Sequence, residues 1–354
     1  MGRGRVESLK KVSVVVPCHN AAKYLDKCLD YLLRQTIGIE NMEVILVDDA
    51  STDHGETIEL LLKYEQRFPE TIIVVQLHEN VRQGGARNKG IACASGEYLI
   101  FCDADDWLLE ETLEHCYNAA VEQDADVVEF LGTNVNERDS IISLEQGTES
   151  KLIELNTEDK RKEFLLTVTE KFSYGSQTKL YRRTMLTENK IKFAEHVIFE
   201  EPSFVVPVRL YEKRHYFLDE RLYVWYLSQG STMRSDWERE HKWDNPQVWL
   251  KMIEDMEHRG FMQLYHQELE YQFLRWGLGL SLRMPLKKGC VLTKAELLFL
   301  KDMTLRLFPD ICSNKYLKHM DNKLSRDRIL VTFLQMKITD EMVEVVNEVM
   351  RQYL

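Results

Sequence analysis

Apolar residues in roughly the first 130 positions alternate between short continuous runs and segments with helical spacing. The continuous runs are rich in Val and Ile, which is typical of strands buried on both faces of a parallel sheet. We predict five strands and four intervening helices: strands at residues 12–16, 44–47, 72–76, 98–102 and 127–131, and helices at 22–35, 53–64, 84–94 and 109–123. This order predicts an open, mostly parallel α/β sheet with helices on both faces, in which ligands bind at the carboxyl ends of the strands.

The pattern changes in the rest of the chain. Residues 134–163 are polar and uneven and predict a loop or irregular segment, whereas the apolar runs at 205–208 and 221–226 do not distinguish helix from strand. Helical spacing returns beyond about residue 236. It predicts helices at residues 247–257, 262–280, 294–307, 326–334 and 340–354. We therefore expect an N-terminal extension (1–11), an α/β domain (12–232) and a helical C-terminal domain (236–354).

Composition and charge narrow the function. The chain has 354 residues and a formal net charge of −12, which argues against a broad basic surface for nucleic acid, so any nucleotide must be held by a few placed groups. The seven cysteines form no CxxC pair and fit reduced thiols. No apolar run approaches the roughly 20 residues of a membrane-spanning helix, and the basic start leads directly into a strand-like run rather than a signal peptide. We expect a cytoplasmic protein.

Acidic residues end the second predicted strand. Asp48 and Asp49 follow the run at 44–47, and a carboxylate there can accept a hydrogen bond from a nucleotide base or a ribose hydroxyl. The alternative interpretation is a capping turn in which Ser51 or Asp53 begins the next helix. Both roles are compatible.

A glycine-rich segment begins the third predicted helix. Gly84 and Gly85 expose backbone N–H groups where a helix N-terminus favours phosphate, and Arg87 adds a guanidinium suited to a diphosphate. The spacing is not that of the dinucleotide fingerprint. A tight turn followed by a surface arginine explains it equally well.

The sharpest signal is the acidic turn Asp103-Ala104-Asp105-Asp106, which follows a buried strand. Three carboxylates so close together repel one another by several kcal/mol unless a cation is present. Oxygen ligands suit Mg²⁺ or Mn²⁺, and the metal would also hold a diphosphate leaving group. A solvated acidic turn is the alternative interpretation.

A fourth signal is the carboxylate pair Glu200 and Glu201 before Pro202. Neighbouring carboxylates raise one another's pKa, which suits a general base. Two glutamates in a polar loop are the alternative.

Together these segments resemble family 2 glycosyltransferases, which have the A-type, Rossmann-like fold and transfer sugars with inversion. The resemblance runs through VSVVVPCHNAAKYL, EVILVDDASTD, the segment from Asn80 to Gly90, GEYLIFCDADD, YGSQTKLYRR, FEEPSF and LYVWYLSQGST, and thus extends to about Thr232. It implies that residues 12–131 bind a nucleotide-diphosphate sugar and that 132–232 face the acceptor. The C-terminal third shows no recognisable pattern.

The resemblance also implies roles for individual residues. Those bordering the base, ribose and diphosphate would be Pro17, His19, Asn20, Asp49, Asn80, Arg87, Asp103 and Ala104. Asp103 and Asp105 would bind Mn²⁺ or Mg²⁺, with Asp105 the more direct ligand, while Asp106 would orient the loop.

Glu201 matches the family's general base, which deprotonates the acceptor hydroxyl for a single inverting displacement. The family usually has aspartate there, and one extra methylene shifts the carboxylate by about an ångström, so Glu200 stays an alternative base. His196 and His215 are nearby candidates for a further metal ligand.

The resemblance leaves donor and acceptor open. UDP is favoured over dTDP or GDP, and the acceptor would be a saccharide, a lipid-linked glycan or a glycoprotein in surface polysaccharide synthesis. Peripheral contact with the inner face of the cell membrane and a homo-oligomer through the C-terminal helices are open partner hypotheses. The basic residues Arg275, Arg283, Lys287 and Lys288 could meet anionic lipid, although a solvated face explains them more simply.

Two rival functions follow from the same motifs. A strand ending in Asp103 and Asp105 also resembles the nucleophile loop of haloacid-dehalogenase-type phosphatases, but Trp107 stands where that family has Thr or Val, and no Gly-Asp pair occurs. A sugar-nucleotide-binding protein without turnover is the other alternative.

Overall fold

The computed structural model describes residues 10–136, 138, 140–145, 147, 149–170, 175–227, 239–318, 321–322 and 324–354. Within these ranges the chain forms two compact units. One comprises residues 10–160, 175–196 and 204–227, and the other comprises 161–170, 197–203 and 239–354. The second unit therefore contains two short segments from the middle of the chain besides the C-terminal helices.

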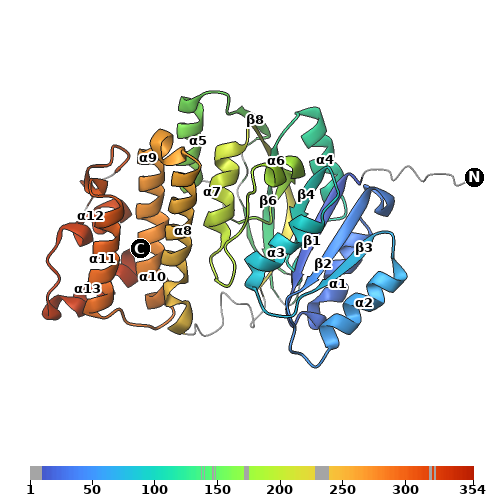
Figure 1. Ribbon diagram of the computed structural model, residues 1–354, viewed down its shortest axis with the longest axis horizontal. Coiled ribbons are helices and arrows are strands. Elements are labelled where there is room, and N and C mark those ends of the chain that lie inside the picture. The colour runs from blue at the N-terminus through green and yellow to red at the C-terminus, as the bar shows by residue number, and fades with distance from the viewer. Residues whose placement is uncertain are drawn as a thin grey trace, which may run out of the picture. The chain divides into compact units, whose positions relative to one another are not determined.

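The first unit is built on one mixed sheet (Figure 1). Its strands are β1 (Val12–Cys18), β2 (Met42–Asp48), β3 (Ile72–Gln76), β4 (Tyr98–Phe101), β5 (Trp107–Leu108), β6 (Val127–Val135), β7 (Ile141–Leu144), β8 (Lys151–Glu154), β9 (Lys179–Arg182) and β10 (Arg214–Tyr226). Its helices are α1 (Ala22–Leu33), α2 (Glu56–Arg67), α3 (Arg82–Cys93), α4 (Thr112–Glu122) and α6 (Arg183–Glu188), with a 3-10 turn at Ile39–Asn41. The predicted elements up to β6 are therefore present, with shifted ends.

The strand order is β3-β2-β1-β4-β9-β6-β10-β5, with β7 beside β6 and β8 beside β10. The four strands from β3 to β4 are parallel, as expected, because helices connect them. Beyond β4 the sheet is mixed, since β9 runs antiparallel to both β4 and β6. The α/β fold is confirmed, and its parallel part is the N-terminal half.

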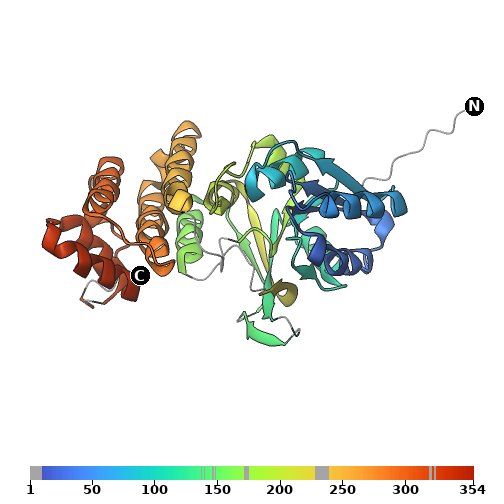
Figure 2. The same cartoon turned by 90° about the horizontal axis from the view of Figure 1, so that it is seen from below.

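Residues 134–163, expected to be a loop, contain the end of β6, both short strands β7 and β8, and the start of α5 (Glu158–Glu170). Every residue of β7 is exposed, and the strand extends away from the body of the sheet (Figure 2). It is held by backbone pairing with β6 rather than by burial. No alternation of apolar and polar residues marked it, so the loop prediction was wrong.

The two ambiguous apolar runs also resolve. Residues 205–208 lie in α7 (Glu201–Tyr211), and residues 221–226 end the long strand β10. Aromatic and β-branched residues suit either state, and tertiary packing decided between them.

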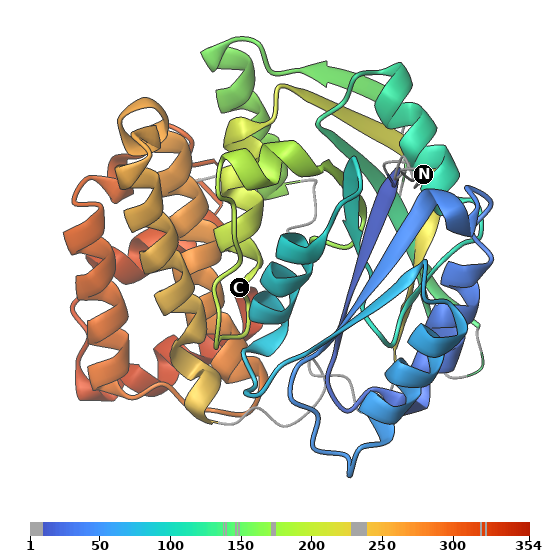
Figure 3. The same cartoon turned by 45° about the vertical axis from the view of Figure 1, so that its right-hand side comes forward.

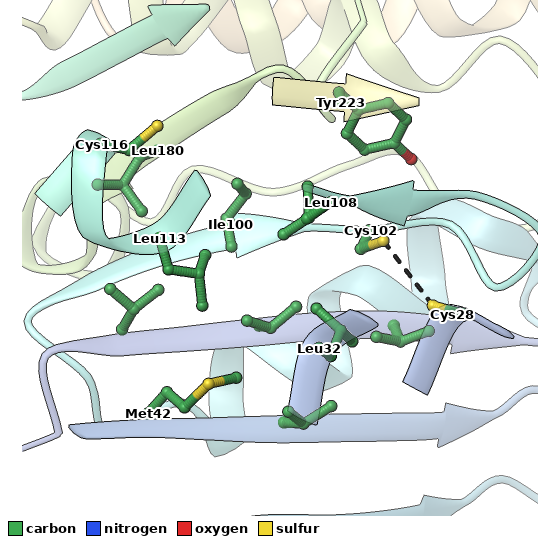
Figure 4. Close-up of a cluster of buried hydrophobic side chains, with 14 of the residues drawn as sticks. Cys28, Leu32, Met42, Ile100, Cys102, Leu108, Leu113, Cys116, Leu180 and Tyr223 are labelled. Carbon is green, nitrogen blue, oxygen red and sulfur yellow. Dashed lines mark hydrogen bonds between the residues drawn. The ribbon is translucent and has the colours of Figure 1, made fainter. Parts of the chain in front are cut away.

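Helices cover both faces of the sheet (Figure 3). On one face, Val14 and Val16 of β1 pack with Leu25 and Leu29 of α1, in a core that α2 and α4 also enter. Figure 4 shows part of this core, where the thiols of Cys28 and Cys102 lie 3.9 Å apart. On the other face, Val15 packs against α3. The alternation along β1 therefore supplies both cores.

The second unit is helical, as expected. Its helices include α8 (Asp244–His258), α9 (Phe261–Gln272), α10 (Gly279–Lys287), α11 (Lys294–Leu307), α12 (Arg326–Gln335) and α13 (Val343–Tyr353), with short 3-10 turns at Arg239–Trp243, Ile311–Ser313 and Asp340–Met342. The single helix expected at 262–280 is instead α9, a π-helical segment at Phe273–Leu278, and α10. None of the described helices combines the length and apolarity that crossing a membrane requires.

Close packing of α3 on β1 depends on a residue without a side chain. A Cβ atom at Gly90 would lie 2.2 Å from Cγ1 of Val15, a separation that real Cβ atoms do not show. Because Val15 is fully buried in the sheet, it has no room to move aside.

We predict that Gly90→Ala lowers the free energy of unfolding by about 1–3 kcal/mol, because the clash outweighs the roughly 1 kcal/mol that alanine gains in a helix. Urea denaturation measures the change. Lys89→Ala, at the exposed neighbouring position, is the control and should alter stability little. Equal stability of Gly90→Ala and the control would contradict this packing.

Candidate active site

The loops that follow β1 and β2 are tied together at the carboxyl edge of the parallel strands. Asn20 accepts a hydrogen bond from the backbone N–H of Thr52 (2.7 Å), and its own N–H donates to Oγ of Ser51 (3.0 Å). Nδ1 of His19 donates to the backbone carbonyl of Asp49 (2.8 Å). His19 and Asn20 are exposed, so both are accessible to a ligand.

The backbone at this edge is unusually bent. Asn20 (φ 52°), Ala50 (φ 52°) and Arg82 (φ 63°) all have left-handed conformations after the ends of β1, β2 and β3. Such backbone is rare outside glycine and is concentrated at functional sites. Pro17 fits at the end of β1, because β4 has stopped pairing with β1 after Val15.

Asp49 is buried and holds the start of α3. Its Oδ1 accepts from the backbone N–H of Val81 (2.8 Å), and burial raises the pKa of the carboxyl although this hydrogen bond opposes the shift. Asp53 in turn accepts from the backbone N–H of Thr57 (3.1 Å) near the start of α2. Neither Ser51 nor Asp53 begins the helix as the capping interpretation expected, because α2 begins at Glu56 with Gly55 as its N-cap. Asp53 supports the first turn from outside the helix, while Asp49 connects the β2 loop to α3.

Asp103 is the most heavily bonded carboxylate of the site. Its Oδ1 accepts from Nε2 of Gln83 (2.7 Å) and Nη2 of Arg87 (2.8 Å), and its Oδ2 accepts from Nε2 of Gln177 (2.9 Å). Its backbone N–H donates to the hydroxyl of Tyr223 (3.1 Å). The three side-chain donors come from α3 and from the segment before β9, and the hydroxyl that accepts from its backbone comes from β10, so Asp103 is fixed from three sides.

Arg87 differs from both sequence-based expectations. It is neither a surface residue nor accessible to a diphosphate, because its side chain is fully buried. The guanidinium carbon lies 5.3 Å from the ring centre of Phe193 and 5.8 Å from that of Phe101. Arg87 therefore orients Asp103 and neutralises its charge from inside the protein.

The glycines before Arg87 are also interior. Gly84 and Gly85 lie inside α3 and are buried, and a Cβ at Gly85 would lie 2.5 Å from the side chain of Val81. They serve packing rather than an open phosphate loop. Ala104 likewise contributes its methyl group to the core, so only its backbone could reach a ligand.

The two remaining acids of the turn have contrasting environments. Burial, together with the charge of Asp103, raises the pKa of Asp105 to about 6. Burial also raises the pKa of Asp106, which accepts from the Tyr223 hydroxyl (2.7 Å) and from the backbone N–H of Tyr226 (2.8 Å). Asp106 therefore ties the turn to β10, as expected of a residue that orients the loop.

We tested whether these acids fit a divalent cation. No group of three or more His, Cys, Asp or Glu side chains is arranged around a metal position within the described ranges. Both oxygens of Asp103 already accept protein hydrogen bonds, whereas the raised pKa of Asp105 marks a carboxylate that a cation would stabilise. Mg²⁺ usually keeps several waters and binds through one or two carboxylates plus phosphates. The residues thus fit an ion shared between Asp105 and a diphosphate.

The two predicted bases lie in the segment that belongs to the second unit. Glu201 is the first residue of α7 and is partly exposed, whereas Glu200 is only 4% exposed. The segment is held by the backbone N–H of Ile198, which donates to Oδ2 of Asp244 in α8 (3.0 Å). Of the pair, Glu201 is the more accessible to an acceptor.

The opposite end of α7 is anchored by buried charges. Arg209 pairs with Glu129 of β6 (2.5 Å) and with Glu212 (3.1 Å), and His215 lies 3.1 Å from Glu212. Burial would raise the pKa of Glu129, but Lys179 and Arg209 outweigh it and hold the value at about 2.

His215 is fully buried in this network and does not suit a metal site, so the hypothesis that it is a further metal ligand was wrong. His196 is exposed, and nothing in the described contacts selects it as a ligand.

Three residues of the site were not identified from the sequence: Gln83, Gln177 and Tyr223. Each lies inside a segment that carried the resemblance, yet an amide or a phenol has no chemistry that singles it out. A partly buried carboxylate such as Asp103 needs hydrogen-bond donors, and a search for polar side chains that could supply them would have included Gln83 and Gln177. Their partners are 20 to 120 positions away along the chain.

Residues 13–188 match the model of the family described as glycosyl transferase family 2. The glycosyltransferase GlyG of Streptococcus pneumoniae is 30% identical over 285 residues, which cover 74% of this chain and 90% of that protein. The chain therefore belongs to glycosyl transferase family 2. This membership excludes the phosphatase alternative.

Other relatives are longer. The poly(ribitol-phosphate) beta-glucosyltransferase of Bacillus spizizenii is 31% identical over 187 residues, which span 53% of this chain but only 27% of that protein. The crystal structure of Staphylococcus aureus TarS 1–349 in complex with UDP-GlcNAc has a TM-score of 0.67 at 23% identity, covering 96% of this chain and 90% of that one. That likeness shows the A-type glycosyltransferase fold followed by a helical region.

We predict that Asp105→Asn stabilises the protein at pH 7 by about 1–2 kcal/mol, less than the full pKa shift would give because the side chain is partly solvated. The folded state raises the pKa of Asp105 to about 6 from 3.8, so the wild-type protein loses stability as the pH rises between these values, where the unfolded chain ionises first, and the loss is complete above pH 6. The advantage should vanish as the pH falls through 6 toward 4, where the wild-type carboxyl is protonated in the folded protein.

Urea denaturation across this pH range measures the effect. The exposed Glu122→Gln in α4 is the control, with no comparable pH-dependent gain. A pH-independent difference for Asp105→Asn would contradict the raised pKa.

Proposed function

We propose that this protein is a metal-dependent inverting glycosyltransferase that moves a sugar from a nucleotide-diphosphate donor, UDP-linked, to a hydroxyl of a surface-polymer acceptor. The proposal rests chiefly on the acidic turn after β4. There Asp103 is fixed by three donors and the neighbouring Asp105 has a raised pKa, which is the arrangement expected where a cation and a diphosphate meet. Family membership supports the same class of reaction.

The donor nucleotide would bind where the loops after β1 and β2 meet. Pro17, His19 and Asn20 would border the base and ribose, together with Asn80, whose Nδ2 lies 3.5 Å from Nε2 of His19. Asp49 would accept a base N–H with the lone pairs that Val81 leaves unused. UDP is favoured because TarS, which shares the fold, has been crystallised with UDP-GlcNAc.

Asp103 would act on the donor without binding metal directly. Because Gln83, Arg87 and Gln177 hold its carboxylate, its remaining acceptor capacity has a fixed direction, suited to a sugar or ribose hydroxyl or to water around a cation. Asp105 would be the residue that holds Mn²⁺ or Mg²⁺. When bound, such an ion neutralises charge on the leaving diphosphate.

Glu201 would be the general base that removes the proton from the acceptor hydroxyl. Its position at the start of a long, anchored helix restricts the carboxylate, which matters because base placement tolerates little error. The extra methylene relative to the family's aspartate would be accommodated by the segment that Asp244 holds. Glu200, being buried, would support this loop rather than act as the base.

The acceptor is proposed from the names of relatives. Poly(ribitol-phosphate) is the acceptor polymer in the names of two of the similar proteins, a glucosyltransferase and an N-acetylglucosaminyltransferase, so a polyol-phosphate or related wall polymer is the leading candidate. A lipid-linked glycan or glycoprotein is the alternative within the same class. A location at the cytoplasmic face of the membrane and a homo-oligomer through the C-terminal helices belong to this proposal as hypotheses.

We predict that Asp105→Ala and Glu201→Gln separate binding from chemistry. Asp105→Ala should weaken donor and Mn²⁺ binding together, whereas Glu201→Gln should leave donor affinity nearly unchanged and lower kcat by about 10²–10⁴-fold, because only the proton acceptor is lost. Calorimetry with a UDP-sugar, and transfer or hydrolysis assays with Mn²⁺ or with a chelator, measure these effects.

Glu188→Gln, an exposed substitution in α6, is the control and should behave like wild type. Full transfer by Glu201→Gln would remove it from the role of base and direct attention to Glu200. Tight donor binding without turnover in the wild-type protein would favour the non-catalytic alternative.

A further inference from the structure

Three arginines lie close together in the helical unit, away from every motif discussed above: Arg326 contacts Arg275 and Gly279, and Arg283 follows Gly279 by one turn of α10. Arg275 lies in the π-helical segment, Arg283 in α10, and Arg326 at the start of α12. We call them the arginine cluster. Arg326 donates through Nη2 to the backbone carbonyl of Arg275, and its guanidinium carbon lies 5.0 Å from the ring centre of Trp276. Two of these residues were noted in the sequence as part of a basic stretch.

The fold makes room for this arrangement. A Cβ at Gly279 would lie 3.0 Å from Nη2 of Arg326, so a glycine on α10 admits the guanidinium. The π-helical segment that precedes Gly279 carries Arg275, and π-helical insertions are frequent at functional sites. The side chains of Arg275, Arg283 and Arg326 remain partly exposed, which leaves the cluster accessible from solvent.

Two of the three arginines have no carboxylate partner within the described ranges. Asp327 lies 3.5 Å from Nε of Arg275 and also accepts from the Tyr271 hydroxyl (3.0 Å) and the backbone N–H of Lys318 (2.9 Å). Asp327 thus pairs with Arg275 and not with Arg283 or Arg326. Within the described ranges Arg283 and Arg326 form no ion pair, and the buried Nε–H of each has no hydrogen-bond acceptor.

The crowding has an electrostatic consequence. Burial, followed by the charges of Arg275 and then Arg283, lowers the pKa of Arg326 to about 10 despite the opposing charge of Asp327. Like charges this close disfavour one another, and an anion bound between the guanidinium groups would relieve the repulsion. The chain is acidic overall, with a net charge of −12, so the crowding of these arginines does not follow from its composition.

We propose that the arginine cluster is a binding site for a phosphate group carried by a soluble ligand. A phosphate offers several acceptor oxygens to the planar forks of the arginines and supplies the negative charge that Arg283 and Arg326 do not find within the described ranges. The inference does not depend on the proposed transferase activity.

The same residues argue against a membrane surface as the ligand. The Nε atoms of Arg283 and Arg326 are buried, so the donors are recessed rather than displayed on an exposed face. The exposed Lys287 lies on the same helix and would be the residue to meet a flat anionic surface. A discrete phosphate group that enters between the side chains fits better.

We predict that inorganic phosphate raises the melting temperature of the full chain above that in chloride at equal ionic strength, and that Arg283→Gln weakens phosphate binding about tenfold or more. Arg283 makes no ion pair with any residue that the structure describes, so Arg283→Gln should fold normally and melt no lower than wild type without phosphate. Thermal unfolding and titration calorimetry measure both effects. Arg326→Gln is a second variant with the same expected loss.

Lys287→Gln is the matched control and should bind phosphate within about twofold of wild type. Phosphate that occupies the proposed donor site would be unaffected by Arg283→Gln, so unchanged affinity in both arginine variants overturns the proposal. No stabilisation by phosphate beyond that of chloride also overturns it. Sedimentation with phosphatidylcholine vesicles containing phosphatidylglycerol tests the lipid source: binding that Arg283→Gln abolishes, without any effect of inorganic phosphate, would assign the cluster to membranes instead.

Discussion

The repulsion among the carboxylates of Asp103, Asp105 and Asp106 is the constraint on which the site depends. Unit charges a few ångströms apart near a protein surface repel one another by several kcal/mol. The fold answers differently for each residue: Asp103 pairs with buried Arg87, Asp106 accepts from Tyr223 and the backbone, and Asp105 retains a raised pKa. Burial and repulsion raise the pKa of both Asp105 and Asp106, and Asp105, whose side chain is not tied to β10, is the carboxylate that we propose meets a cation.

Helix α3 links this constraint to the packing of the sheet. Gly90 lets the helix lie directly on Val15 of β1, and the preceding turn of α3 carries Gln83 and Arg87 toward the end of β4. A helix held farther from the sheet would withdraw the donors of Asp103. The small residues of this segment therefore serve the acidic turn indirectly, through the distance between helix and strand, and not as a phosphate loop.

Helix α7 and the segment before it are held by two separate sets of contacts. Arg209 and Glu129 fix one end of α7 by buried ion pairs, while Asp244 of α8 holds the segment that leads to Glu201. Breaking a buried ion pair of this kind typically costs about 3–5 kcal/mol, so the Arg209 end of α7 has a well-defined position against β6. In the arginine cluster of the same helical unit, Arg283 and Arg326 have no ion pair within the described ranges, which is the reason we propose a ligand there.

The sequence by itself determined β1 to β4, β6 and helices α1 to α4, because burial on both strand faces and helical spacing are local patterns, and it placed the acidic turn at a strand end; the two-residue strand β5 was not predicted. It did not determine how the acids are satisfied. Gln177 reaches Asp103 across 74 positions and Tyr223 reaches Asp106 across 117, so only the assembled sheet brings them together. The same holds for the burial of Arg87 and for β7 and β8, which pairing with neighbouring strands stabilises without any apolar pattern of their own. Local physics fixed the elements, whereas long-range contacts fixed the chemistry of their side chains.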